Sequence, residues 1–250
     1  MKTITVFSLK GGTGRTSVVC NLAAALYRQG RRCMAIDTDP QNALGLHLGM
    51  QVGERFGIAR ETLTEKELDE FRKTAGSPMP YVPFGHCDLQ EYLDMEGAYL
   101  FDQVWWTQRK AALVNSDTEF LLLDTPSGLL GHAYQRFEES DLVLIVLRPD
   151  AASYATIPDT EALLARYPQV KWVRYLINEM DASKTLCNDV RQAMSNTLGE
   201  RLLKVTVPLD EAMRDSFGQQ RSTVEHHPES QSARAFHELA KWVMSTLPTH

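Results

Sequence analysis

The chain has 250 residues, of which 43% are hydrophobic and 23% charged, a composition typical of a globular protein with one large core. Intrinsic disorder, a collagen-like repeat and a disulfide scaffold are therefore excluded. With 32 acidic and 26 basic side chains the net charge is -6, so no overall positive field attracts nucleic acid or anionic lipid. The cysteines form no Cys-x-x-Cys pair, which argues against a zinc knuckle or an iron–sulfur cluster and favours a reducing compartment; they are Cys20, Cys33, Cys87 and Cys187.

Apolar runs along the sequence are short, and none approaches the ~20 residues that cross a bilayer. The N-terminus enters a strand-like run at once and lacks the long apolar stretch and small-residue cleavage site of a signal peptide. We therefore expect a cytoplasmic protein without a transmembrane helix.

Runs rich in β-branched and aliphatic residues predict six strands. Most are continuous apolar blocks separated by stretches long enough for helices, which indicates a parallel sheet covered on both faces. The sequence therefore predicts an α/β fold with three layers, α/β/α, around a mostly parallel twisted sheet. We expect residues 1–250 to form a single domain, because no linker or repeat interrupts them. The predicted strands span residues 3–9, 32–36, 119–123, 142–147, 170–177 and 202–207.

The first predicted helix follows the first strand. Apolar residues recur at every fourth position, at Val18, Leu22 and Leu26, and this spacing predicts a helix over 16–29 with one buried face. Gly30 comes directly after it and is the expected C-terminal stop, since glycine readily takes the left-handed conformation that ends a helix.

Later segments predict further helices and one irregular stretch. Two polar, helix-prone stretches lie near 61–73 and 89–115. Between them, residues 76–85 contain three prolines, which predicts a loop or a short edge segment. Near the C-terminus the sequence predicts a helix packed on the sheet. The alternative is a membrane-targeting helix, which is less favoured because basic residues are few; the apolar positions are 236, 239, 240, 243 and 247.

A glycine-rich segment lies between the first predicted strand and the first predicted helix. Its glycines allow the backbone to curl so that successive N–H groups point inward, and the helix N-terminus adds a partial positive charge. Such a nest suits a polyphosphate, whereas the alternative is a glycine-rich turn that binds no ligand. The candidate phosphate-binding residues are Lys10, Gly11, Gly12, Thr13, Gly14, Arg15, Thr16 and Ser17.

The end of this segment departs from the ordinary P-loop pattern. That pattern ends in Gly-Lys-[Ser/Thr], whereas this chain has Gly14, Arg15 and Thr16. Arginine keeps the positive charge but replaces a compact ammonium with a planar fork. We expect the Thr16 hydroxyl to bind Mg²⁺ and Ser17 to contact a more distal phosphate oxygen.

Carboxylates end two of the predicted strands. Asp124 closes the buried run 120–124, at the position where a Walker-B carboxylate holds Mg²⁺ through water. Asp37 and Asp39 end the second strand, where a turn or helix cap is the alternative interpretation. Because open α/β sheets bind ligands at the carboxyl ends of their strands, three carboxylates there favour a phosphate and magnesium site.

Together these motifs resemble the MinD/ParA-type deviant Walker-A ATPases, which belong to the SIMIBI class of P-loop NTPases. The hallmark of that group is Lys-Gly-Gly-x-Gly-Lys-[Thr/Ser]; Lys10 matches its signature lysine, and Arg15 departs from its second lysine. The resemblance covers nearly the whole chain and continues at 37–41, 124–127, 149–153, Asn178 and 207–210. It implies a three-layer P-loop NTPase fold with ATP and Mg²⁺ as cofactors.

The resemblance also implies catalytic roles for single residues. Lys10 reaches across a two-fold interface to the partner subunit's nucleotide, so that a homodimer sandwiches two ATP molecules. Asp39 orients the attacking water, which makes Lys10 and Asp39 the catalytic pair. Because Arg15 replaces the lysine, we expect ATP binding with slow or absent hydrolysis.

Metal and adenine ligands follow from the same resemblance. The metal set that it implies is Thr16, Asp39 and Asp124. The adenine is read by Asn178 and by the backbone around Pro208 and Asp210.

Within that class, segments 81–85, 209–215 and 224–225 resemble the BcsQ family of bacterial cellulose synthesis operons. This resemblance implies an ATP-dependent dimeric switch that promotes assembly or polar localisation of the cellulose synthase in biofilm-forming cells. It implies BcsR, BcsE and the cellulose synthase as partners, no nucleic acid, and a place at the inner membrane only through the synthase complex.

Two other functions stay open from the sequence. One is a ParA-type partitioning ATPase acting on DNA or another cargo, which would need a basic patch formed on dimerisation. The other is a redox or metal-insertion relative with a cluster bridging the dimer axis, which the scattered cysteines disfavour. The adjacent residues His226 and His227 are interpreted as loop residues, because neighbours in sequence do not share one helical or strand face as a metal pair would.

Overall fold

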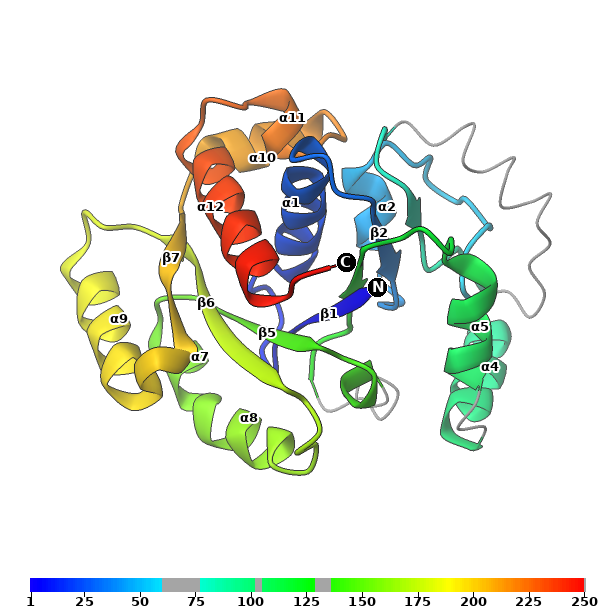
Figure 1. Cartoon of the computed structure of the whole chain (residues 1–250), viewed down its shortest axis with the longest axis horizontal. Helices are drawn as coiled ribbons and strands as arrows, with labels where there is room; N and C mark the ends of the chain where they lie inside the picture. The colour runs from blue at the N-terminus through cyan, green and yellow to red at the C-terminus, as the bar shows by residue number, and fades with distance from the viewer. Residues whose placement is uncertain (60–76, 102–104, 129–135, 250) are drawn as a thin grey trace.

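The computed structural model of the chain describes residues 1–59, 77–101, 105–128 and 136–249. Within these residues, seven parallel strands form one sheet in the order β3-β2-β4-β1-β5-β6-β7, with helices on both sides of it (Figure 1). The predicted α/β fold is confirmed. The strands are β1 (Lys2–Phe7), β2 (Cys33–Asp37), β3 (Tyr81–Val82), β4 (Phe120–Asp124), β5 (Leu142–Leu147), β6 (Trp172–Met180) and β7 (Leu202–Pro208).

All six predicted strands are present, and the proline-rich segment supplies the seventh. β3 is a two-residue edge strand that pairs with β2, so the edge-segment alternative is correct for 81–82. β1 ends at Phe7, two residues before the predicted end, because the glycine-rich loop begins there. β6 continues to Met180, past the predicted end at 177.

The core explains why the strand sequences are apolar without alternation. In β5, Leu142, Leu144 and Val146 belong to one buried cluster with the helix that follows β1. The intervening residues of the same strand belong to a second buried cluster on the opposite face; they are Val143, Ile145 and Leu147. Because both faces of the strand are covered, neither set of residues is polar.

Helix α1 (Arg15–Arg28) follows β1 and begins after Gly14, close to the predicted start. It ends as predicted, because Gly30 has a φ of 77° and the Arg31 N–H donates to the Leu26 carbonyl at 3.1 Å. Its buried face carries small and aliphatic side chains from Val18 to Leu26. This face packs against the sheet and so positions the start of the helix next to the loop that precedes it.

Helix α12 (Gln231–Thr246) packs beside α1 and against β7 (Figure 1), as predicted for the C-terminal segment. Ser230 caps it by accepting a hydrogen bond from the Ala233 N–H at 3.1 Å. Phe236, Leu239 and Val243 are fully buried. The apolar stripe is therefore used in the core of the protein.

The other helices of the described residues lie between successive strands, except that α10 and α11 lie between β7 and α12. They are α2 (Ala43–His47), α4 (Leu89–Phe101), α5 (Trp105–Leu113), α7 (Ala151–Ala155), α8 (Ile157–Leu164), α9 (Thr185–Leu198), the 3₁₀ helix η1 (Gly199–Arg201), α10 (Glu211–Gly218) and α11 (Thr223–His226). The predicted helix near 61–73 lies outside the described residues, whereas 89–115 contains α4 and α5. Within the described part of the chain, no helix combines the length and apolarity needed to span a bilayer.

Candidate functional site

The loop after β1 is held in a conformation that needs glycine. Gly12 and Gly14 have φ values of 70° and 83°, in the left-handed region that other residues rarely adopt. A Cβ atom on Gly14 would lie 2.3 Å from Nδ2 of Asn178. Asn178 itself donates from that nitrogen to the Thr13 carbonyl at 2.8 Å. The loop is therefore shaped by the end of β6 as well as by its own glycines.

A cavity of about 500 Å³ lies beside this loop. Its volume falls in the range of about 300–1,000 Å³ that small-molecule sites occupy. The cavity joins the loop to the segments after β2 and β4, and helix α4 contributes one side chain. Its lining residues are Gly12, Arg15, Asp39, Pro40, Gln41, Tyr92, Pro126 and Ser127.

The Arg15 guanidinium is paired within the protein. Its Nη1 donates to the Ser8 carbonyl at 3.2 Å, and its Nη2 forms an ion pair with Oδ2 of Asp39 at 3.3 Å. The side chains of Arg15 and Asp39 are only 9% and 10% exposed, so water screens this pair weakly. The residue predicted to bind phosphate therefore contacts the carboxylate predicted to orient water.

Asp124 is completely buried at the end of β4, in register with Val6 of β1 and Asp37 of β2. Among the described residues, neither of its carboxylate oxygens has a well-formed hydrogen bond. Burial raises its pKa to about 7, although the Thr16 hydroxyl and the Arg15 charge act in the opposite direction. An unsatisfied buried carboxylate beside a hydroxyl is an oxygen donor set that fits Mg²⁺.

The Asp37 carboxylate accepts hydrogen bonds from backbone N–H groups, as the turn or helix cap interpretation predicted. Its two carboxylate oxygens accept hydrogen bonds from the N–H groups of Asp39 at 2.9 Å and Leu44 at 3.0 Å. Burial, and then the neighbouring charge of Asp124, raise the pKa of Asp37 well above its usual range. Asp37 therefore holds the turn that presents Asp39 to the cavity.

Lys10 forms an ion pair within its own chain. Its Nζ lies 2.9 and 2.8 Å from the two carboxylate oxygens of Asp150, with the two side chains 29% and 37% exposed. Asp150 also caps α7 by accepting from the Ser153 N–H at 2.7 Å. Partial burial opposes ionisation, but the bonds from Lys10 and Ser153 lower the pKa of Asp150. Sequence reasoning missed this partner, although the Asp-x-x-Ser spacing is that of a helix cap.

The three residues predicted to contact adenine lie at the ends of β6 and β7. Asn178 is buried, and its Oδ1 has no partner among the described residues. Pro208 ends β7. Asp210 caps α10 by accepting from the Ala212 N–H at 3.0 Å, and it accepts from the Ser232 N–H at 3.1 Å and hydroxyl at 2.9 Å. Asn178 thus faces the loop, whereas the Asp210 side chain is engaged by the starts of α10 and α12.

Two further residues near the site were not predicted, one that lines the cavity and one that supports the helix after the loop. Tyr92 of α4 lines the cavity, and its hydroxyl donates to Glu96 at 2.9 Å. Asn21 of α1 accepts at Oδ1 from the N–H groups of Thr223 at 2.7 Å and Val224 at 3.2 Å, which ties α11 to the helix that begins at the loop. No local pattern could have found either role, because the loops that line the cavity with Tyr92 and the N–H groups bonded to Asn21 lie far from them in sequence.

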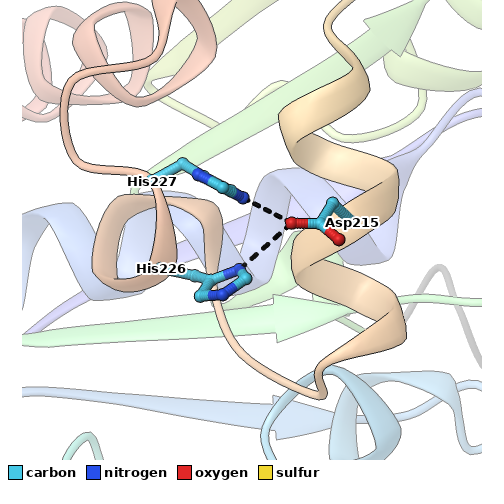
Figure 2. A group of neighbouring side chains, drawn as sticks. All are labelled: Asp215, His226 and His227. Carbon is cyan, nitrogen blue, oxygen red and sulfur yellow. Dashed lines mark hydrogen bonds and ion pairs between the residues drawn. The ribbon is translucent and has the colours of Figure 1, made fainter.

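The interpretation of both adjacent histidines as loop residues is wrong for His226, which ends α11. His227 follows with φ −127° and ψ 65°, so the chain turns out of the helix between them. Figure 2 shows both rings directed at the carboxylate of Asp215 in α10. Both rings reach one carboxylate because His227 has left the helix, whereas two neighbours within a helix would point in different directions.

The sheet is parallel, a glycine-rich loop follows its central strand β1, and the neighbouring strands β2 and β4 end in acidic residues. The loop ends in a variant that contains arginine. These features define a P-loop NTPase of the MinD/ParA class. A family model described as "Cellulose biosynthesis protein BcsQ" matches residues 1–244. The chain belongs to the BcsQ family.

The chain is similar to a BcsQ protein and also to other proteins of the MinD/ParA class. BcsQ of Salmonella typhimurium is 25% identical over 94% of this chain and 91% of its own length. The chromosome-partitioning ATPase Soj of Thermus thermophilus is 24% identical over 98% of this chain and 96% of its own length. The fold is that of the septum site-determining protein MinD from Pyrococcus horikoshii, whose structure was solved with Mg-ADP. The two structures superpose with a TM-score of 0.70 and 22% sequence identity, over 97% of this chain and 95% of the MinD chain.

Proposed function

We propose that this protein is an ATP-binding, dimeric switch of the bacterial cellulose secretion system that promotes assembly or localisation of the cellulose synthase. One observation carries the nucleotide part: a glycine-shaped cradle borders a cavity, with a buried, unsatisfied carboxylate at Asp124 nearby. Membership in the BcsQ family supports the cellulose part. The protein would act in the cytoplasm and reach the inner membrane through the synthase complex.

Different groups of the loop and the strand ends would bind the phosphates and the Mg²⁺ ion. Backbone N–H groups of residues 11–16 would face the phosphates, as at other helix N-termini. Thr16, Asp39 and Asp124 would hold Mg²⁺, which neutralises phosphate charge when bound.

The adenine would lie at the ends of β6 and β7. The unpartnered Oδ1 of Asn178 would accept a hydrogen bond from the adenine amino group. The backbone at Pro208 and Asp210 would lie beside the base.

Slow hydrolysis belongs to the same proposal. Asp39 is bonded to Arg15, so the carboxylate proposed to orient water is already occupied. A guanidinium still pairs with phosphate in the bound state, but it replaces the lysine ammonium that neutralises charge in the transition state. Binding of ATP rather than its turnover would therefore set the state of the switch.

The nucleotide part is tested by titrating the purified chain with a fluorescent ATP analogue in the presence of Mg²⁺, while its mass is measured by light scattering. We expect binding together with a doubling of mass. Gly14→Ala should abolish binding, because its Cβ would clash with Asn178. Gly30→Ala is the matched control, because Gly30 also has a positive φ but open space around it. Equal binding by both variants would contradict the proposed cradle.

The cellulose part needs a separate experiment in the source bacterium. Deleting the gene should reduce cellulose output, and the wild-type gene but not Gly14→Ala should restore it. Undiminished cellulose after deletion would remove this part of the proposal and leave nucleotide binding intact.

A partitioning ATPase is the second candidate, supported by the full-length match to Soj. It would have to bind DNA in the ATP state, against a net charge of -6. A salt-sensitive shift of nonspecific DNA that requires ATP would favour this function over the first.

A further inference from the structure

We propose that Asp215, His226 and His227 form a binding site for a single borderline divalent metal ion, of which Zn²⁺ is the natural example. The three residues come from α10 and from the end of α11, and none of them lines the cavity beside the glycine-rich loop. The site is therefore separate from the proposed nucleotide site and does not depend on it.

The ligand atoms already lie near the separations that a metal requires. Oδ2 of Asp215 is 2.6 Å from Nε2 of His227 and 3.7 Å from Nδ1 of His226, and the ligand atoms of all three lie within 4.8 Å of one another. Zn²⁺ with bonds of about 2.0–2.1 Å in tetrahedral geometry places neighbouring ligand atoms about 3.3 Å apart. Small rotations of the three side chains would bring their atoms to that spacing (Figure 2).

The backbone holds both imidazoles on one side. His226 ends α11, whereas His227 has left helical geometry, so the two ring centroids are 4.3 Å apart with an interplanar angle of 56°. α11 is itself fixed to α1 by the bonds from Thr223 and Val224 to Asn21. A site built on anchored helices loses little conformational entropy when the metal binds.

The chemistry of the donors selects the kind of metal. Two imidazole nitrogens and one carboxylate oxygen suit Zn²⁺, Co²⁺ or Ni²⁺, whereas Mg²⁺ and Ca²⁺ prefer oxygen donors alone. Three protein ligands leave one tetrahedral position open for water. The side chain of Asp215 is 55% exposed and that of His227 is 39% exposed, so an ion can enter from solvent. Nδ1 of His226 is shielded from solvent and lies beyond hydrogen-bond distance from Asp215.

A bound ion would join α10 to α11. Asp210, which caps α10, lies next to the end of β7, and α11 is tied to α1. The metal would therefore lock residues 210–227 onto the helix that starts at the phosphate loop. We expect a higher Tm in Zn²⁺ than in chelator, because an ion that binds only the folded chain stabilises it.

The test uses the full chain, free of any affinity tag and stripped of metal, titrated with Zn²⁺ by calorimetry and with Co²⁺ by visible absorption. We expect one Zn²⁺ per chain and Co²⁺ bands typical of a four-coordinate site. His226→Gln, His227→Gln and Asp215→Asn should each weaken Zn²⁺ binding by more than the about 10–100-fold that loss of an outer-shell partner costs.

Two control variants separate this site from other donors. His86→Gln removes an exposed histidine elsewhere, and Cys87→Ser removes a partly exposed thiol; neither should change Zn²⁺ binding. Circular dichroism checks that each variant is folded. Zn²⁺ affinity that survives His226→Gln and His227→Gln would overturn the proposal. A wild-type chain that shows no stoichiometric Zn²⁺ binding and no four-coordinate Co²⁺ spectrum would also overturn it, and would leave the cluster as a hydrogen-bonded contact between helices.

Discussion

At the scale of single residues, Arg15 is the position where this chain departs from the usual loop. We expect Arg15→Lys to raise ATP turnover at least about tenfold. The lysine ammonium can neutralise charge on the phosphates, and Asp39 is no longer held in an ion pair with Arg15. Phosphate release at saturating Mg-ATP measures this change, and the Kd for ATP should shift far less. Arg32→Lys, at an exposed arginine, is the control. Unchanged turnover in Arg15→Lys would show that the pair between Arg15 and Asp39 does not limit hydrolysis.

His47 makes the folding stability of the chain depend on pH in the acidic range. Burial lowers its pKa from 6.5 to about 4, and its ring stacks on Phe217 with centroids 4.2 Å apart. Between these two values the unfolded chain binds more protons than the native chain, so the stability that His47 contributes above pH 6.5 is lost as the pH falls toward 4.

Urea unfolding across that range measures the effect. We expect His47→Gln to remove a pH-dependent loss of up to about 3 kcal/mol. His86→Gln, which replaces an exposed histidine, should keep the wild-type slope. A His47→Gln variant with an unaltered slope would mean that His47 does not control acid stability.

The site residues show what a sequence can and cannot predict. The glycine-rich loop and Asp124 were predictable because each is a local pattern at the end of an apolar run. The pairs Arg15–Asp39 and Lys10–Asp150 were not, because they join residues 24 and 140 positions apart through loops whose conformation the sequence does not encode locally.

At the scale of elements, the predicted strands were accurate where a strand is buried on both faces. β3 could only be given as one of two alternatives, since two residues between prolines carry no periodicity. β6 ran past its predicted end because Asn178 and Glu179 are polar, although their backbone still belongs to the strand. Burial thus made the central strands predictable, and polar residues at their ends obscured the boundaries.

The contact between α1 and α11 supports a prediction at the same scale. Asn21→Ala should lower the free energy of unfolding by about 1–3 kcal/mol, because two backbone N–H groups at the start of α11 lose their buried acceptor. Urea denaturation measures this loss. Asn188→Ala is the matched control, because its amide bonds the carbonyls of Ala182 and Lys184 at the protein surface. Equal effects of the two variants would show that the Asn21 contact is not important for stability.

At the scale of the whole molecule, the pair between Lys10 and Asp150 opposes the proposed dimer. Lys10 must leave Asp150 before it can reach a partner's nucleotide, and a partly exposed ion pair contributes about 0.2–1 kcal/mol. Because each protomer of the dimer must release one such pair, Asp150→Asn should lower the dimer dissociation constant in Mg-ATP about two- to thirtyfold, while asparagine still caps α7. Sedimentation measures the constant.

Asp159→Asn, in the first turn of α8, is the control for a general change in charge. It should leave the dimer dissociation constant unaltered. Weaker dimerisation of Asp150→Asn would instead mean that Asp150 supports the assembled state.

The strand order also determines when the strands can pair during translation. β1 and β2 do not pair with each other in the described sheet; β4 lies between them, and Lys2 is in register with Phe120. A ribosome must therefore deliver more than a hundred residues after β1 before that strand finds its neighbour β4, and α12 closes over α1 only after β7 has been made. Until β4 has been made, the apolar side chains of β1 and β2 lack their neighbouring strand, so we expect the nascent chain to be prone to aggregation during this interval.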